Sequence, residues 1–301
     1  MQKSWFTRLV EAIFFGNYFY GICAIGLSVE ASMQQQYPLN RPLFYVLIFF
    51  ATVLYYTLAY IGEGNTNIAN KRSMWYAEHK QFVRYSQFVL TGAFIVSAFL
   101  FVLRHLGGLR AAPFLYYVML AVFPVVAAMY YGSSGRYNLR KIGWLKPFVI
   151  GFTWAGLVTV YPIIISCIEY GLAYEVRLIT VLLFVKNFMF ISVLCILFDI
   201  KDYGTDYNHQ LKTFVVEVGL RKTIFYIIIP LCILGLGTFL TYGFTHGFSS
   251  MKIALNTLPF LALLMVAYSL HRRRSILYYL IIIDGLMLVK AICGITAMSF
   301  F

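Results

Sequence analysis

Long apolar stretches recur along the whole chain and are separated by short polar segments. Each stretch is close to the length of roughly 20 residues that an α-helix needs to cross the hydrocarbon core of a bilayer. Nine such stretches lie near 10–29, 43–62, 86–104, 112–131, 147–168, 178–198, 223–244, 253–270 and 275–298. This pattern predicts an all-α, polytopic membrane helix bundle with about nine transmembrane helices.

The composition supports a membrane protein and excludes an ordinary soluble domain. Hydrophobic residues make up 61% of the 301 residues and charged residues only 12%, far from the balance of soluble proteins. No linker rich in Pro, Gly or Ser divides the chain, so residues 1–301 are predicted to form a single domain.

The basic residues are distributed unequally between the two sides of the predicted bundle. Of the 24 Lys and Arg residues, 17 fall before the first stretch or after the second, fourth, sixth and eighth, and five fall on the opposite side. By the positive-inside rule the N-terminus is cytoplasmic and the C-terminus is outside, in what we expect to be a bacterial cytoplasmic membrane. The net charge of +13 then reflects contact with anionic lipid headgroups, and no nucleic-acid partner is needed to explain it.

Three of the four aspartates stand together where the sixth apolar stretch ends. Asp199, Asp202 and Asp206 are spaced i, i+3 and i+7, which places them on one face of a helix. Carboxylates gathered in this way repel one another unless a cation lies among them, and hard oxygen ligands suit Mg²⁺, which commonly bridges carboxylates to phosphates. The spacing predicts a Mg²⁺ site at the cytoplasmic boundary of the membrane.

Other polar side chains near the cytoplasmic boundary allow two interpretations. Asn and Glu side chains after the second stretch are possible metal or ligand contacts or a solvated turn, and basic residues after the fourth stretch bind phosphate or only set the topology. Inside the predicted spans, an ionisable side chain needs a partner or a cavity. For Lys186 and Asp284 we favour a structural ion pair between neighbouring helices over a role in substrate binding. Asp284 and Lys290 are too far round one helix to pair with each other.

The segment from Phe198 to Asp206, followed by Lys212-Thr213-Phe214 and Val218-Gly219, resembles the second aspartate-rich motif of the UbiA family of intramembrane prenyltransferases. Asn17 and Tyr131 also stand where that family usually has an asparagine and a tyrosine. The family's first motif aligns with Gly62, Glu63, Thr66 and Asn70, and of these only Glu63 keeps a charge.

This resemblance implies that an isoprenyl diphosphate is held through Mg²⁺ in a cavity between the two motifs and that its chain moves to an aromatic, quinone-precursor or lipid acceptor in the membrane. The catalytic residues it implies are Asp199, Asp202, Asp206 and Tyr131. Glu63 joins the three aspartates as a metal ligand. The implied substrate-binding residues are Asn17, Glu63, Asn67, Asn70, Lys80, Arg140, Lys141 and Lys212.

Two other functions remain open from the sequence. The degenerate first motif is compatible with a non-catalytic UbiA-like protein that keeps a lipid or diphosphate pocket. A small transporter would place its charges near the bilayer midplane, whereas most of the aspartates here lie at one boundary. The sequence does not define an oligomeric state.

Overall fold

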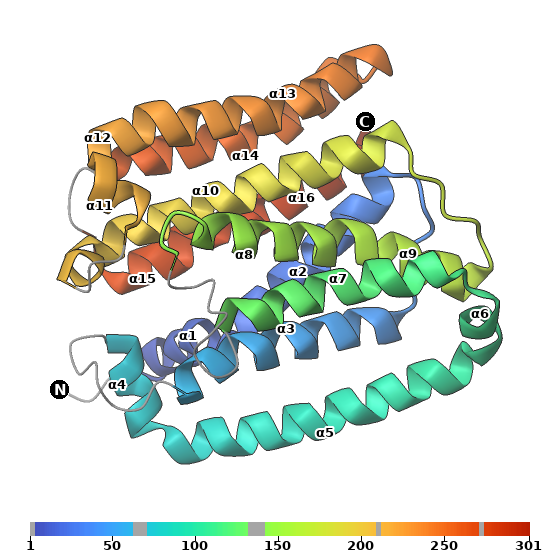
Figure 1. The fold of residues 1–301 in the computed structure, drawn as a ribbon, viewed down its shortest axis with the longest axis horizontal. Coiled ribbons are helices and arrows are strands. Elements are labelled where there is room, and N and C mark those ends of the chain that lie inside the picture. The colour runs from blue at the N-terminus through green and yellow to red at the C-terminus, as the bar shows by residue number, and fades with distance from the viewer. Residues whose placement is uncertain (1–3, 63–70, 132–141, 209–211, 271–273) are drawn as a thin grey trace.

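The computed structural model describes residues 4–62, 71–131, 142–208, 212–270 and 274–301. Within these ranges the chain is helical and contains no strand. The long helices lie side by side in one bundle, with the N-terminus at one end and the C-terminus toward the other (Figure 1). This arrangement confirms the predicted all-α bundle.

The first half of the chain supplies the helices on one side of the bundle, and α5 forms its margin (Figure 1). They are α1 (Trp5–Phe15), α2 (Tyr18–Gln34), α3 (Pro42–Gly62), α4 (Lys71–Glu78), α5 (Lys80–Arg104), α6 (Leu106–Ala111), α7 (Phe114–Tyr131), α8 (Lys146–Ala155), the π-helical turn η2 (Gly156–Val160) and α9 (Tyr161–Tyr170).

The second half completes the bundle, and α13 and α14 form the opposite margin (Figure 1). Its helices are α10 (Leu178–Asn208), α11 (Phe214–Val218), α12 (Leu220–Thr223), the π-helical turn η3 (Ile224–Ile228), α13 (Ile229–Thr245), α14 (Ser250–Ser269), α15 (Ile276–Tyr278), the π-helical turn η4 (Tyr279–Ile283) and α16 (Gly285–Phe300).

Six helices of the described residues are long and apolar enough to cross a membrane. They are Lys80–Arg104, Lys146–Tyr170, Leu178–Lys201, Leu220–Thr245, Ser250–Ser269 and Ile276–Phe300. The other three predicted stretches coincide with the bent pair α1 and α2 and with two shorter apolar helices, Pro42–Leu58 and Phe114–Tyr130. The structure therefore supports a polytopic bundle without fixing the number of spans at nine.

The first predicted span, near 10–29, does not form one straight helix. Asn17 takes a left-handed conformation with φ 66°, and α1 and α2 meet there at an angle of 61°. Since few residues other than Gly adopt positive φ without cost, the side chain of Asn17 must be held by its surroundings. After the bend, α2 runs from Tyr18 to Gln34 and therefore extends beyond the end of the predicted span.

Two of the three π-helical turns come just before a proline. Pro162 is the second residue of α9, after η2, and Pro230 is the second residue of α13, after η3. Proline has no N–H and clashes with the preceding turn of an α-helix, and a locally wider turn relieves that conflict. The third turn, η4, has no such proline and ends at Asp284.

The largest hydrophobic cluster lies where α2, α8, α10, α14 and α16 pack together. Phe190, Leu27, Phe260 and Ile283 are buried there. In contrast, most side chains of α5 are exposed, and most of the exposed ones are apolar, as expected for a helix that faces lipid.

Candidate functional site

A cavity of about 470 Å³ lies inside the bundle. Its wall includes residues from helices that are far apart in the sequence, from α2 to α16. The side chains that line it are Tyr20, Ala51, Thr52, Tyr55, Tyr56, Tyr60, Arg72, Phe123, Pro124, Ala127, Tyr130, Lys146, Val149, Ile150, Thr153, Trp154, Leu157, Tyr161, Ile191, Leu194, Cys195, Phe198, Lys201, Ile276, Leu280, Asp284 and Met287.

One face of α10 forms part of this wall. Ile191, Leu194, Cys195 and Phe198 line the cavity, and their spacing of three and four residues puts them in one stripe along the helix. The stripe ends at Lys201, in the same turns that carry the aspartates. The face of α10 that lines the cavity is therefore apolar along most of its length and charged at its end.

Cations gather at the end of the cavity toward the N-terminal end of the bundle. Arg72 comes from α4, Lys146 begins α8 and Lys201 lies in the last turns of α10. Among the described lining residues, Asp284 is the one carboxylate that accompanies these three cations. The lining therefore carries a surplus of positive charge at one end, which suits a phosphate-bearing ligand.

The guanidinium group of Arg72 is held from several sides. Its Nη2 donates to the backbone oxygen of Phe15 at 3.1 Å and to Oδ1 of Asn17, and its Cζ lies 4.2 Å from the ring centre of Tyr60. Arg72 itself is buried. Nδ2 of Asn17 in turn donates to Tyr76 Oη at 3.1 Å. The bend at Asn17 thus also fixes the position of this cation.

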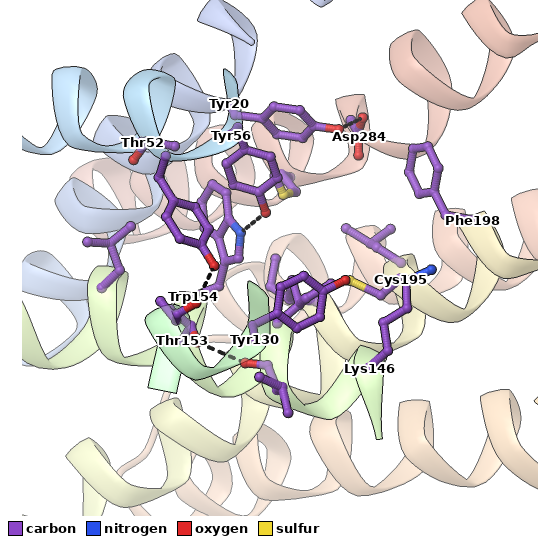
Figure 2. Close-up of a pocket in the computed structure, with 18 of the residues that line it drawn as sticks. Tyr20, Thr52, Tyr56, Tyr130, Lys146, Thr153, Trp154, Cys195, Phe198 and Asp284 are labelled. Atoms are coloured by element: carbon purple, nitrogen blue, oxygen red, sulfur yellow. Dashed lines mark hydrogen bonds between the residues drawn. The ribbon is translucent and has the colours of Figure 1, made fainter. Parts of the chain in front are cut away.

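Aromatic side chains line the cavity beside the cations (Figure 2). The rings of Tyr20 and Tyr56 stack with centres 4.6 Å apart, and Nε1 of Trp154 donates to Tyr56 Oη at 2.5 Å. Figure 2 shows Tyr20 pointing toward Asp284, and its hydroxyl donates to Asp284 Oδ2 at 2.6 Å. This connected group offers several π faces to whatever fills the cavity.

Asp199 lies next to the cavity but does not line it. Its side chain is almost fully buried, and Oδ1 accepts a hydrogen bond from Lys146 Nζ at 2.8 Å. This carboxylate oxygen is thus bound to an ammonium group. Among the described residues no group of three His, Cys, Asp or Glu side chains is arranged to hold a metal, so the described donors do not by themselves fit a Mg²⁺ site.

The other aspartates of the stripe are helical, as expected, because α10 extends to Asn208. The side chains of Asp202 and Asp206 lie outside the described residues, as does that of Tyr131 at the end of α7, whereas Tyr130 lines the cavity. Predicted site residues that fall wholly outside the described ranges are Glu63, Asn67, Asn70, Arg140 and Lys141.

The remaining predicted site residues, Lys80, Lys212 and Asn17, do not line the cavity. Lys80 begins α5 with an exposed side chain, and Lys212 is exposed with its Nζ 4.0 Å from Glu217 Oε1. Neither lines the cavity. Asn17 is buried and does not line it either, but it binds Arg72, which does.

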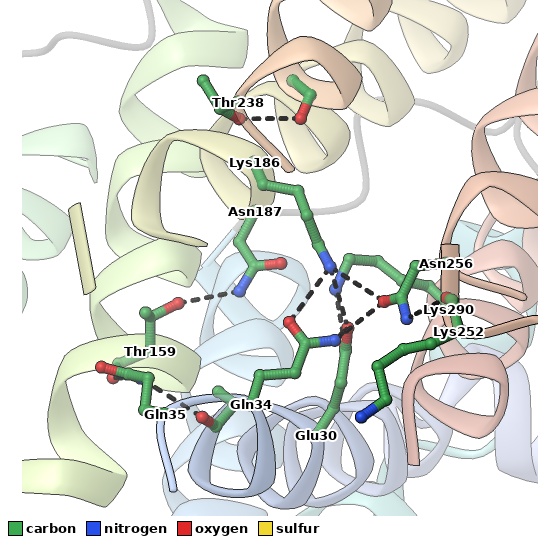
Figure 3. Close-up of polar contacts among 12 residues, drawn as sticks. Glu30, Gln34, Gln35, Thr159, Lys186, Asn187, Thr238, Lys252, Asn256 and Lys290 are labelled. Atoms are coloured by element: carbon green, nitrogen blue, oxygen red, sulfur yellow. Dashed lines mark hydrogen bonds and ion pairs between the residues drawn. The ribbon is translucent and has the colours of Figure 1, made fainter. Parts of the chain in front are cut away.

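The predicted ion pair between Lys186 and Asp284 is wrong. Lys186 Nζ lies 3.4 Å from Glu30 Oε1, in a second polar cluster with Lys290 and Asn256 (Figure 3), whereas Asp284 receives its hydrogen bond from Tyr20. None of the four residues of this second cluster lines the cavity. Asp284, which directly precedes α16, and Lys186 in α10 therefore belong to two separate sites.

Sequence reasoning missed several lining residues for an identifiable reason. Arg72, Lys146 and Lys201 counted only toward topology, since cations are expected in any cytoplasmic loop. Tyr20, Tyr56 and Trp154 are aromatic residues in a chain with 24 Tyr and 28 Phe, so their residue type gave no signal. For Asp284, its position within an apolar stretch was the usable signal.

No protein-family model matches the sequence, and no curated protein matches it. A solved structure does match: that of a digeranylgeranylglyceryl phosphate synthase in membranes, with a TM-score of 0.59 and 14% sequence identity. The match covers 98% of this chain and 100% of the other. Along its whole length the chain therefore shares the fold of that synthase, which confirms the UbiA-like fold that the resemblance implied.

Proposed function

We propose that this protein is an intramembrane prenyltransferase that moves an isoprenyl chain from its diphosphate to an acceptor dissolved in the membrane. The observation that carries the proposal is the composition of the cavity, with three cations at one end and aromatic and apolar side chains along the rest. An isoprenyl diphosphate has the same division into a multiply charged head and a long apolar tail.

The cationic end supports the binding of the diphosphate and its departure. Breaking the allylic C–O bond leaves the electron pair on the diphosphate, so the reaction is favoured by positive groups that are already in place. Arg72 is preorganised by Asn17 and Phe15, and Lys146 is fixed by Asp199. Lys201 Nζ lies 5.9 Å from the ring centre of Phe198, near the same end.

The aromatic wall suits the other half of the reaction. Loss of diphosphate leaves a delocalised allylic cation, and the faces of aromatic rings attract cations. The stacked rings of Tyr20 and Tyr56, with Trp154 beside them, supply such faces. The apolar walls beyond them hold the chain and exclude water, which would otherwise capture the cation.

Asp202 and Asp206 are the residues that we propose to hold Mg²⁺, which would neutralise part of the charge of the diphosphate. At about 100° per residue, position 202 falls within the stripe of α10 that lines the cavity, between Phe198 and Cys195, whereas position 199 lies further round the helix. This register agrees with Asp199 being engaged by Lys146.

Donor binding and turnover test the proposal in purified protein. Geranyl, farnesyl and geranylgeranyl diphosphates are added with Mg²⁺ to the protein in detergent, and thermal unfolding is followed. Pyrophosphate release is measured with a total lipid extract from bacterial membranes as acceptor. We expect at least one donor to raise the unfolding temperature and to release pyrophosphate.

Matched lysine variants locate the binding site. Lys201→Met is expected to weaken donor binding about tenfold, because a charged hydrogen bond or ion pair contributes ~1.5–3 kcal/mol. Lys80→Met and Lys212→Met remove exposed cations that do not line the cavity and are expected to leave donor binding unchanged. If a donor stabilises the protein but no pyrophosphate is released, the protein binds the donor without turnover, which contradicts the proposed transfer. If donor affinity falls equally in all three variants, this cavity is not the donor site.

A further inference from the structure

Asp284 is a buried carboxylate in the wall of the cavity, in the middle of an apolar helix. A charged group at such a depth is costly unless it is paired or has a function. Among the described residues its hydrogen-bond partner is the neutral hydroxyl of Tyr20, at 2.6 Å from Oδ2. Within the part of the chain that the structure describes, no ion pair explains Asp284 as a structural residue.

The local backbone directs Asp284 into the cavity. It follows η4, a π-helical turn over Tyr279–Ile283, and precedes α16. π-helical turns within α-helices occur frequently at functional sites. Leu280 and Met287, one turn before and after Asp284, also line the cavity, so this face of the helix is turned toward the cavity.

Tyr20 fixes the carboxylate from α2, the helix that packs against α16. Its ring stacks on Tyr56 with centres 4.6 Å apart, and Trp154 Nε1 holds Tyr56 through its hydroxyl. The hydroxyl of Tyr20 donates a hydrogen bond to Oδ2 of Asp284, whereas Oδ1 of Asp284 has no hydrogen-bond partner among the described residues. The second oxygen is thus oriented for a donor that belongs to a ligand.

We infer that Asp284 is the proton acceptor of the transfer reaction and that Tyr20 is its positioning residue, for an acceptor molecule that attacks through a hydroxyl group. The inference rests on the proposed prenyl transfer. The allylic C–O bond of the donor breaks and its electron pair leaves with the diphosphate. The acceptor's oxygen bonds to the allylic carbon, and its proton passes to the Asp284 carboxylate.

The other charged groups of the wall are unsuited to this step. Arg72, Lys146 and Lys201 are cations and serve the leaving diphosphate. Asp199 does not line the cavity and is bound to Lys146. Among the described lining residues, Asp284 is the carboxylate that lies beside the aromatic group where the allylic cation is stabilised.

The test compares transfer with solvolysis of the donor in the same protein. Radiolabelled farnesyl diphosphate is incubated with Mg²⁺ and a total lipid extract from bacterial membranes, and prenylated lipid is counted. A parallel sample without lipid measures release of farnesol, in which the C–O bond breaks in the same way but water attacks the allylic carbon and loses its proton to the solvent. The ratio of the two rates isolates the proton-transfer step.

Removing a general base commonly costs 10²–10⁴-fold, so Asp284→Asn is expected to lower transfer at least about 100-fold while solvolysis falls much less. Asp284→Glu is expected to restore part of the transfer, and Tyr20→Phe to lower the ratio about tenfold. Donor-induced thermal stabilisation in each variant shows that it is folded and binds the donor.

The two proposals fail in different ways. If the wild-type protein neither transfers nor solvolyses the donor, prenyl transfer itself is wrong. If the wild type transfers and Asp284→Asn leaves the ratio of transfer to solvolysis unchanged, Asp284 is not the proton acceptor. If Asp284→Asn does not fold, an unchanged ratio in Tyr20→Phe or an absence of transfer in a folded Asp284→Glu overturns the inference.

Discussion

Lys290 Nζ lies 2.6 Å from Oε2 of Glu30, and both side chains are buried although 260 positions separate them in the chain. The other carboxylate oxygen of Glu30 lies 3.4 Å from Lys186 Nζ. One carboxylate thus connects α2 with α10 and α16 (Figure 3). Lys186 also contacts Gln34 Oε1 at 3.2 Å and Asn256 Oδ1 at 3.3 Å, so the cluster joins four helices.

The charges of this cluster predict an unequal response to two substitutions. Glu30→Gln leaves two buried lysines without a carboxylate, which is expected to cost ~3–5 kcal/mol. Lys290→Met removes one lysine and leaves Glu30 balanced by Lys186, so its cost is expected to be clearly smaller. Thermal unfolding in detergent measures both, and equal losses of stability would contradict this account of the cluster.

A close backbone approach supports the same cluster. A Cβ atom on Gly294 would lie 2.5 Å from Cγ and 2.7 Å from Oε1 of Glu30, much closer than carbon atoms normally approach. Gly294→Ala is therefore expected to displace Glu30 from its lysines and to destabilise the protein by ~1–3 kcal/mol. Thermal unfolding in detergent measures this loss of stability.

Gly285→Ala is the matched control, because it lies in the same helix and nothing would lie within 4 Å of its Cβ. Replacing a helical Gly by Ala normally stabilises by about 1 kcal/mol. The control is thus expected to be neutral or stabilising. A Gly294→Ala protein as stable as Gly285→Ala would show that the Glu30 side chain moves aside without cost.

The cluster also explains what the apolar pattern could and could not predict. Hydropathy located the helices, because burial in lipid requires long apolar segments, but it treated 10–29 as one span and left Glu30 beyond its end. The helix after the bend at Asn17 instead continues to Gln34, and its buried residues include Glu30. That bend depends on contacts with Thr57, Arg72 and Tyr76, which are remote in sequence.

For the predicted site as well, the sequence indicates local helical spacing but not the partners that side chains find on other helices. The spacing of Asp199, Asp202 and Asp206 correctly predicted one helix, since helical spacing is a local property. The partners of Asp199 and Asp284 depend on how helices face one another, and here they are Lys146 and Tyr20. A single sequence does not contain that rotational information, so the expected pair of Lys186 with Asp284 was wrong.

Asn17 is expected to support donor binding through Arg72. Asn17→Gly keeps the left-handed backbone at φ 66° but removes the side chain that binds the guanidinium. Because a hydrogen bond to a charged group contributes ~1.5–3 kcal/mol, we expect about tenfold weaker binding of farnesyl diphosphate. The unfolding temperature as a function of donor concentration measures the affinity.

Gln36→Gly provides the control for this substitution. Gln36 is the other described residue besides glycine with positive φ, at 58°, and it is exposed and does not line the cavity. Glycine relieves backbone strain equally at both positions. If both variants bind the donor as tightly as the wild type does, Asn17 does not act through Arg72.

The orientation of the bundle decides which compartment supplies the donor. Glu78, in α4, and Ser250, at the start of α14, are both exposed and lie at opposite ends of the bundle (Figure 1). The cationic end of the cavity includes Arg72 of the same short helix α4. The sequence assigns 17 of the 24 basic residues to the predicted cytoplasmic side, so by the positive-inside rule we expect this end of the cavity to face the cytoplasm, where soluble isoprenyl diphosphates are available.

Cysteine labelling tests this orientation. After replacement of the five cysteines, a membrane-impermeant maleimide added to intact cells is expected to label Ser250→Cys but not Glu78→Cys. Both are expected to react once the cells are opened. Labelling of Glu78→Cys in sealed cells, with Ser250→Cys protected, would place the cationic end outside and contradict a cytoplasmic donor.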